Sequence, residues 1–74
     1  MLDQIKAILK DYVEVPEDKI IPEANLVGDL GLNSLDVMNL VMEFEDAFGI
    51  EIPDEDIGRF MTVQDVVEYV EDKV

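Results

Sequence analysis

Apolar residues recur at three- and four-residue spacing in three separate segments of the chain, and this spacing predicts a fold made of helices. The first segment covers residues 3–14, the second follows Asn33–Ser34 and ends near Gly49, and the third begins after Thr62. A short helix is expected over residues 53–60, where proline and acidic residues suit a helix start. The expected fold class is all-α: a four-helix bundle with three longer helices, a short third helix, and a long loop between the first two.

The segment between the first two expected helices, residues 16–33, has no sustained periodicity. It contains two prolines, Gly28 and Gly31, and it is predicted to be a loop of about 18 residues, which is long for a compact domain. Apolar residues in and beside it favour packing against the core: Val15, Ile20, Ile21, Leu26, Val27, Leu30 and Leu32. With 74 residues, the chain is expected to form one domain, residues 1–74.

The charge and the missing residue types exclude several classes of function. There are 5 Lys and Arg residues against 19 Asp and Glu residues, so the formal net charge is −14, and such a chain repels the phosphates of nucleic acid. There is no Cys and no His, which removes disulfides, thiolate metal sites, cysteine nucleophiles and the commonest general base. We therefore expect no catalytic residue, no resident metal and no enzyme activity.

No apolar run approaches the ~20 residues that cross a bilayer, and the first residues lack the pattern of a signal peptide. The absence of cysteine does not separate reducing from oxidising compartments. We expect a complete, monomeric intracellular protein, placed in the cytoplasm, with no membrane span.

The second expected helix has two apolar faces. At about 100° per residue, one face is predicted to join the core and carries Val37, Leu40, Val41, Phe44 and Phe48. The nearly opposite face carries Leu35, Met38 and Met42 among Asn39, Glu45 and Asp46. Two interpretations remain: the long loop covers this second face, or the face is an exposed docking patch in which flexible methionines adapt to partners. The last helix has one stripe, predicted to be buried: Val63, Val66, Val67, Val70 and Val74.

Acidic residues gather around the second helix. Between Lys19 and Arg59 there are acids but no bases: Glu23, Asp29, Asp36, Glu43, Glu45, Asp46, Glu51, Asp54, Glu55 and Asp56. A charge run of this kind usually serves as a solvated face. Here it also surrounds the helix with two apolar faces, so its field favours steering a partner with a basic surface toward that helix.

Ser34 stands where the loop meets the second helix. A serine at such a junction is most often a helix cap, and Asn33 is an equally good cap. The hydroxyl is not a triad nucleophile, because the chain has no histidine and no lysine near it in sequence. Any chemistry at Ser34 is therefore performed by another protein. A phosphate attached there would meet the free N–H groups at the start of the helix.

The residues around Ser34 resemble the acyl carrier protein family, whose motif is Asp-Ser-Leu at the head of the second helix. In this chain Asn33-Ser34-Leu35-Asp36 stands at that place, after Asp29-Leu30-Gly31. The resemblance extends from about Ile5 to Val70. It also includes Val15-Pro16-Glu17, Phe48, the run Ile50-Glu51-Ile52-Pro53-Asp54-Glu55, and Thr62-Val63-Gln64-Asp65.

The resemblance implies a four-helix bundle whose serine, here Ser34, carries 4′-phosphopantetheine through a phosphodiester. A phosphopantetheinyl transferase attaches this group from coenzyme A with Mg²⁺. The terminal thiol then carries acyl groups as thioesters between the enzymes of fatty-acid synthesis, or of related polyketide and specialised lipid synthesis. These enzymes dock through basic surfaces. The chain itself is implied to be a carrier and not an enzyme.

The resemblance also implies which residues bind partner enzymes. The positions at which this sequence matches the recognition helix and the short third helix of the family are Leu35, Asp36, Met38, Met42, Glu45, Asp46, Asp54 and Glu55. Two positions depart, because Asn33 replaces the usual Asp and Asn39 replaces a common Glu on the same partner-binding face. These departures favour a specialised acyl carrier over the housekeeping one.

Two other functions compete with the carrier. An unmodified acidic adaptor would use the patch of Leu35, Met38 and Met42 to bind a basic partner, and modification of Ser34 separates it from a carrier. A Ca²⁺ sensor fails on spacing, because Arg59 stands where the Ca²⁺-binding loop requires glycine. Adventitious binding of cations near the acidic residues remains an open alternative.

For a carrier, the interior offers either a closed core or an acyl pocket with these walls: Leu40, Val41, Phe44, Ile52, Ile57, Phe60 and Val66.

Overall fold

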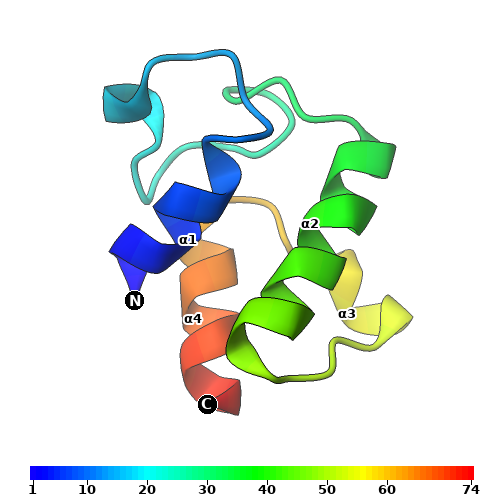
Figure 1. Ribbon diagram of the computed structural model, residues 1–74. Coiled ribbons are helices and arrows are strands. Elements are labelled where there is room, and N and C mark those ends of the chain that lie inside the picture. The colour runs from blue at the N-terminus through cyan, green and yellow to red at the C-terminus, as the bar shows by residue number, and fades with distance from the viewer.

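The structure is a computed structural model that describes residues 1–74, and its regular elements are all helical (Figure 1). The longer helices are α1 (Leu2–Leu9), α2 (Ser34–Phe48) and α4 (Val63–Lys73). The short ones are α3 (Asp54–Ile57) and the one-turn 3₁₀ helix η1 (Glu17–Lys19). The predicted all-α fold, with three longer helices and a short third one, is confirmed.

Helix α1 makes the main helix–helix contacts, and its two partners are α2 and α4. The core beneath these helices contains 17 buried residues, and none of them is polar or charged. They come from all parts of the chain: Ile5, Leu9, Ile20, Ala24, Leu26, Leu30, Leu32, Leu40, Val41, Phe44, Ile52, Phe60, Val63, Val66, Val67, Tyr69 and Val70. Burial of apolar surface therefore stabilises the fold without help from buried ion pairs.

The first helix is shorter than the predicted span of residues 3–14. It ends at Leu9, and the chain continues into tight turns in which the Tyr12 N–H donates to the Leu9 carbonyl at 2.9 Å. Tyr12 and Val13 still pack against the core, which is why the apolar spacing persists beyond the end of the helix. Val15 precedes a proline and leaves helical geometry, so the turns between Lys10 and Val15 absorb the change of direction.

The long loop between α1 and α2 covers one end of the bundle, at the top of Figure 1. It is fixed to the segment before α4 by backbone hydrogen bonds, including Leu26 N–H to the Met61 carbonyl at 2.9 Å and Val63 N–H to the Ala24 carbonyl at 3.0 Å. The predicted packing is correct for Ile20, Leu26, Leu30 and Leu32, which are buried, while Val15 is half-buried. It is wrong for Ile21 and Val27, which are exposed because they lie on the outer side of the loop.

Helix α4 has a side-chain cap at its start and an exposed residue after its end. The Thr62 hydroxyl accepts from the Asp65 N–H at 3.2 Å, and the Asp65 carboxylate accepts from the Thr62 N–H at 3.0 Å, so the two residues form a reciprocal cap. Four of the predicted valines are buried, but Val74 is 66% exposed. It follows the last helical residue, Lys73, so no neighbouring element covers it.

The sequence allowed either a closed core or an acyl pocket, and the structure has the closed core. All the predicted pocket walls are buried except Ile57, which is half-buried, and they belong to the one packed core. Of these walls only Phe60 also lines a surface groove. None of the helices has the length and apolar character that crossing a membrane requires.

Candidate functional site

Helix α2 is capped by Asn33, and this settles which of two residues performs the capping. The Asn33 side-chain oxygen accepts from the Asp36 N–H at 2.8 Å, and the Asp36 carboxylate accepts from the Asn33 N–H at 3.3 Å. Asn33, which stands in place of the usual aspartate of the family, therefore preserves the start of the helix, as the sequence predicted. At the other end Gly49, with φ 64°, closes α2 in the left-handed conformation expected of a C-terminal glycine.

Ser34 is the first residue of α2 and its side chain is exposed. Because Asn33 supplies the cap, the Ser34 hydroxyl takes part in none of the side-chain hydrogen bonds of the protein. It is also the only serine in the chain. The threonine at the start of α4, Thr62, differs in this respect, since its hydroxyl is occupied as the helix cap. The structure thus presents one free aliphatic hydroxyl at a helix start.

The backbone around Ser34 suits a phosphate. The N–H groups of Ser34 and Leu35 have no hydrogen-bond acceptor within the protein, whereas Val37 N–H donates to the Asn33 carbonyl at 3.0 Å. Free N–H groups at the start of a 15-residue helix, together with its dipole, favour a negative group. The site therefore fits a phosphodiester on the Ser34 oxygen, which is the linkage that would attach a phosphopantetheine group.

The loop before Ser34 is held in one shape by its own hydrogen bonds. The Asn25 side-chain oxygen accepts from Gly28 N–H at 2.8 Å, and the Asp29 carboxylate accepts from Asn25 N–H at 2.7 Å. Gly31 follows with φ 73°, a left-handed conformation that side chains disfavour. This network sets the direction from which the chain enters α2 and so fixes the position of Ser34.

The second apolar face of α2 is open to solvent. Leu35 is 68% exposed, Met38 45% and Met42 56%, so the interpretation in which the long loop covers them is wrong. Of the polar residues predicted to join this face, Asp46 is exposed, while Asp36 and Asn39 are half-buried. Asp54 and Glu55, in the first turn of α3, are exposed as well.

Glu45 differs from the other predicted partner-binding residues because its carboxylate is used inside the protein. It is half-buried and accepts a hydrogen bond from the Ile52 N–H at 2.8 Å. This bond ties the end of the α2–α3 connection to the side of α2. A substitution at Glu45 therefore disturbs structure as well as surface charge, and Asp46 is the cleaner probe of the face.

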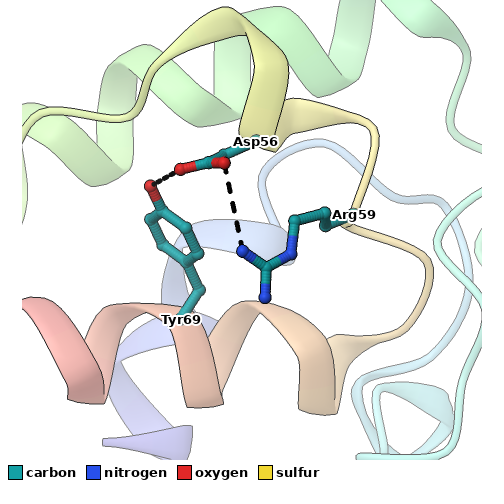
Figure 2. Close-up of polar contacts among 3 residues, drawn as sticks. All are labelled: Asp56, Arg59 and Tyr69. Carbon is teal, nitrogen blue, oxygen red and sulfur yellow. Dashed lines mark hydrogen bonds and ion pairs between the residues drawn. The ribbon is translucent and has the colours of Figure 1, made fainter.

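A polar contact that sequence reasoning missed joins α3 to α4. The Tyr69 hydroxyl donates to the Asp56 carboxylate at 2.6 Å, and Arg59 lies 3.9 Å from the other carboxylate oxygen (Figure 2). Burial, and then the hydrogen bond to Asp56, raises the pKa of Tyr69 to about 12. No local signal connects residues 13 positions apart on two different helices, so no motif pointed to this contact.

No group of three or more acidic side chains is arranged to hold a metal ion.

Comparison with known proteins adds two findings to this geometry. A family described as "Phosphopantetheine attachment site" matches residues 3–70, a span that contains Ser34. An acyl carrier protein of Thermosynechococcus vestitus is 43% identical over 74 residues, which are 100% of this chain and 91% of the relative.

Proposed function

The chain belongs to the acyl carrier protein family, a family of non-catalytic carriers, and on that basis we propose that Ser34 bears its 4′-phosphopantetheine group. One observation carries the assignment: the cap formed by Asn33 and Asp36 leaves the only serine hydroxyl exposed and unpaired at the start of α2. When attached, the group supplies a terminal thiol that holds acyl groups as thioesters.

The residues around Ser34 place the hydroxyl for attack on a phosphorus atom of coenzyme A held by a phosphopantetheinyl transferase with Mg²⁺. In this reaction the Ser34 oxygen forms the new P–O bond, the bond to the adenosine bisphosphate portion breaks, and the hydroxyl proton leaves. The chain has no histidine, and the carboxylate of Asp36 already accepts the Asn33 N–H, so we assign the base to the transferase. The free N–H groups of Ser34 and Leu35 then face the negative phosphodiester.

The exposed face of α2 is the surface that docks partner enzymes. Leu35, Met38 and Met42 supply apolar contact area, and Asp46 supplies a charge beside it. The partners that fit are transferases and acyl-chain enzymes with basic surfaces, because the chain carries a net charge of −14. Asp36, Asn39, Glu45, Asp54 and Glu55 complete the predicted set, with Glu45 acting chiefly through its bond to Ile52.

The cargo that fits is an acyl intermediate of fatty-acid synthesis or of related polyketide and specialised lipid synthesis. Asn33 and Asn39 remove two negative charges from the face on which basic enzymes dock. A weaker field there favours a dedicated set of partners over the general one.

Co-expression with phosphopantetheinyl transferases of different types tests the modification. The wild-type chain is expected to gain about 340 Da, and Ser34→Ala is expected to gain nothing because no other serine is present. A chain that stays unmodified with every transferase would instead support the acidic adaptor.

Paired variants test the docking face. Met42→Lys and Asp46→Lys both change exposed positions, so they should lower the rate of phosphopantetheinyl transfer while the protein stays folded by circular dichroism. Asp3→Lys, at an exposed position on α1, makes the same charge change as Asp46→Lys; it is the control and should keep most of the rate. Equal rates for Asp46→Lys and Asp3→Lys would remove Asp46 from the docking surface.

A further inference from the structure

The four methionines hold all the sulfur of the chain, since it contains no cysteine. Met1 packs against the core, and none of the 17 buried core residues is a methionine. The other three, Met38, Met42 and Met61, are exposed. Their thioethers are therefore the sulfur atoms that a reagent in solution reaches, and a chemical change at these positions leaves the packing of the core intact.

Met38 and Met42 lie next to each other on the docking face of α2, the exposed surface formed by Leu35, Met38, Met42 and Asp46. Side chains four positions apart on a helix are neighbours, with Cβ atoms about 6 Å apart. Neither methionine belongs to the residues that pack against the core. The middle of the docking face thus presents two thioethers to solvent.

The charge of the chain determines which oxidants reach these two sulfur atoms. The net charge is −14, and two exposed acids stand close to the pair, with Glu43 directly after Met42 and Asp46 one turn further along α2. Anionic oxidants are repelled by this field, whereas a neutral molecule is not. Hydrogen peroxide is neutral and transfers oxygen to thioethers, so it is the oxidant that fits this surface.

The oxidation converts each thioether to a sulfoxide. The sulfur attacks one oxygen of hydrogen peroxide, and the S–O bond forms as the O–O bond breaks. The proton on the transferred oxygen moves to the other oxygen, which leaves as water. The sulfur loses two electrons and the peroxide gains them. Methionine sulfoxide reductases return the product to methionine, so the change is reversible.

A sulfoxide makes the docking face unfavourable for binding. A partner that buries the side chains of Met38 and Met42 contacts apolar atoms before oxidation. After oxidation it buries a sulfoxide oxygen, and a polar atom that is buried without a hydrogen-bond donor costs free energy. Helix α2 keeps its structure, because both side chains project from its exposed face. Oxidation therefore weakens docking and preserves the fold.

We propose that Met38 and Met42 form a reversible oxidation site, and that conversion of their thioethers to sulfoxides by hydrogen peroxide weakens the docking of partner enzymes. The oxidation site stands without the proposed function, whereas its effect on docking rests on it. Reduction of the sulfoxides restores docking.

Peptide mass spectrometry of the unmodified chain, after brief treatment with hydrogen peroxide, tests the oxidation site. Met38 and Met42 should each gain one oxygen atom, and circular dichroism and the midpoint of thermal unfolding should stay close to those of the untreated chain. Met61 provides the reference rate, because it is 58% exposed and Met42 is 56% exposed. Oxidation of Met61 alone, or unfolding of the chain when Met38 and Met42 are oxidised, would overturn the oxidation site.

The rate of phosphopantetheinyl transfer at a chain concentration far below KM tests the effect on docking. Peroxide is removed first, so that the transferase and coenzyme A are not oxidised. The untreated chain must gain about 340 Da, so that a failure to modify Ser34 is a separate result. Verified oxidation of the wild type should lower the rate roughly tenfold. The two reductases that act on the two sulfoxide epimers should restore it.

Two variants, each compared with its own untreated sample, locate the effect. Met61→Leu removes the exposed sulfur between α3 and α4, outside the docking face, and this chain should lose the same share of its rate as the wild type. The double variant Met38→Leu/Met42→Leu has no sulfur on the docking face, so treatment should leave its rate unchanged. Equal losses in the double variant and the wild type, an oxidised wild type that keeps its rate, or a loss that the reductases do not reverse would overturn the proposed effect on docking.

Discussion

Asn33 and Ser34 have separate tasks at the start of α2. Asn33 supplies the side-chain oxygen that caps α2, and Asp36 returns a carboxylate to the Asn33 N–H. Ser34 is left without a structural task. The chemistry at Ser34 and the stability of the helix start are therefore separable by substitution at adjacent positions.

Asn33→Ala and Ser34→Ala should consequently affect stability differently. Loss of the cap is expected to lower the free energy of unfolding by about 1 kcal/mol. Ser34→Ala removes no contact, so its effect should stay within about 0.5 kcal/mol. Urea denaturation followed by circular dichroism measures both, and a larger loss for Ser34→Ala would mean that its hydroxyl supports the fold.

Two glycines provide a matched test of backbone strain near the site. Gly31 has φ 73° and Gly58 has φ −64°, and at either position an added Cβ atom would have no neighbouring atom within 4 Å. Gly31→Ala should therefore cost about 1 kcal/mol of unfolding free energy, while Gly58→Ala should be neutral or stabilising by up to about 1 kcal/mol. Thermal unfolding compares them, and equal effects would contradict this explanation.

At the scale of elements, boundaries that depend on local chemistry were predictable from sequence. Asn33, Gly49 and Thr62 act through neighbours within four residues, so their residue types indicate where α2 and α4 begin and where α2 ends. The end of α1 was mispredicted, because apolar spacing continues through Tyr12 while the backbone has already turned.

Contacts between elements were not predictable in the same way. The carboxylate of Glu45 resembles any acid on an exposed face, yet it accepts the Ile52 N–H seven residues away. Tyr69 and Asp56 meet only because α3 lies beside α4. The residue proposed for attachment, Ser34, was thus within reach of sequence reasoning, whereas the contact between Tyr69 and Asp56 and the internal use of Glu45 required the structure.

The link between α3 and α4 makes stability sensitive to alkaline pH. The pKa of Tyr69 is raised from 10.0 to about 12 by burial and by Asp56, with Glu45 also raising it and Arg59 opposing, and the Lys73 ammonium lies 5.4 Å from the ring centroid. The protonated phenol is favoured in the folded state. Its stabilising contribution is therefore complete below pH 10 and is lost as the pH rises toward about 12.

Unfolding experiments between pH 9 and pH 12 check this expectation. The wild type should lose stability over this range more steeply than Tyr69→Phe, which has no phenol to ionise at that position. Tyr12→Phe controls for the other tyrosine, whose pKa is raised by its hydrogen bond to the Glu43 carboxylate. Parallel pH profiles for the wild type and Tyr69→Phe would contradict a role for Tyr69.

At the scale of the whole molecule, the negative charge destabilises the folded state but favours the binding of basic partners. The chain carries −14, and its one ion pair joins Asp56 and Arg59 at 3.9 Å, so the folded state contains mainly repulsion. The same charge attracts basic enzymes. Salt screens both, since the Debye length falls from about 30 Å at about 0.01 M to about 8 Å at about 0.15 M.

Added NaCl should therefore raise the midpoint of thermal unfolding while it weakens transferase binding. Calorimetry and a binding titration across one salt series measure the two effects on the same protein. Both quantities falling together, or a flat binding curve, would contradict the proposed role of the acidic face.

The assignment of Ser34 is tested most directly by locating the added mass within the chain. After reaction with coenzyme A and a transferase, fragmentation mass spectrometry should place about 340 Da on Ser34 and leave Thr62, Tyr12 and Tyr69 unmodified. The Ser34→Ala chain, folded to the same degree, should acquire nothing. Mass on any other residue, or modification of the Ser34→Ala chain, would contradict the assignment.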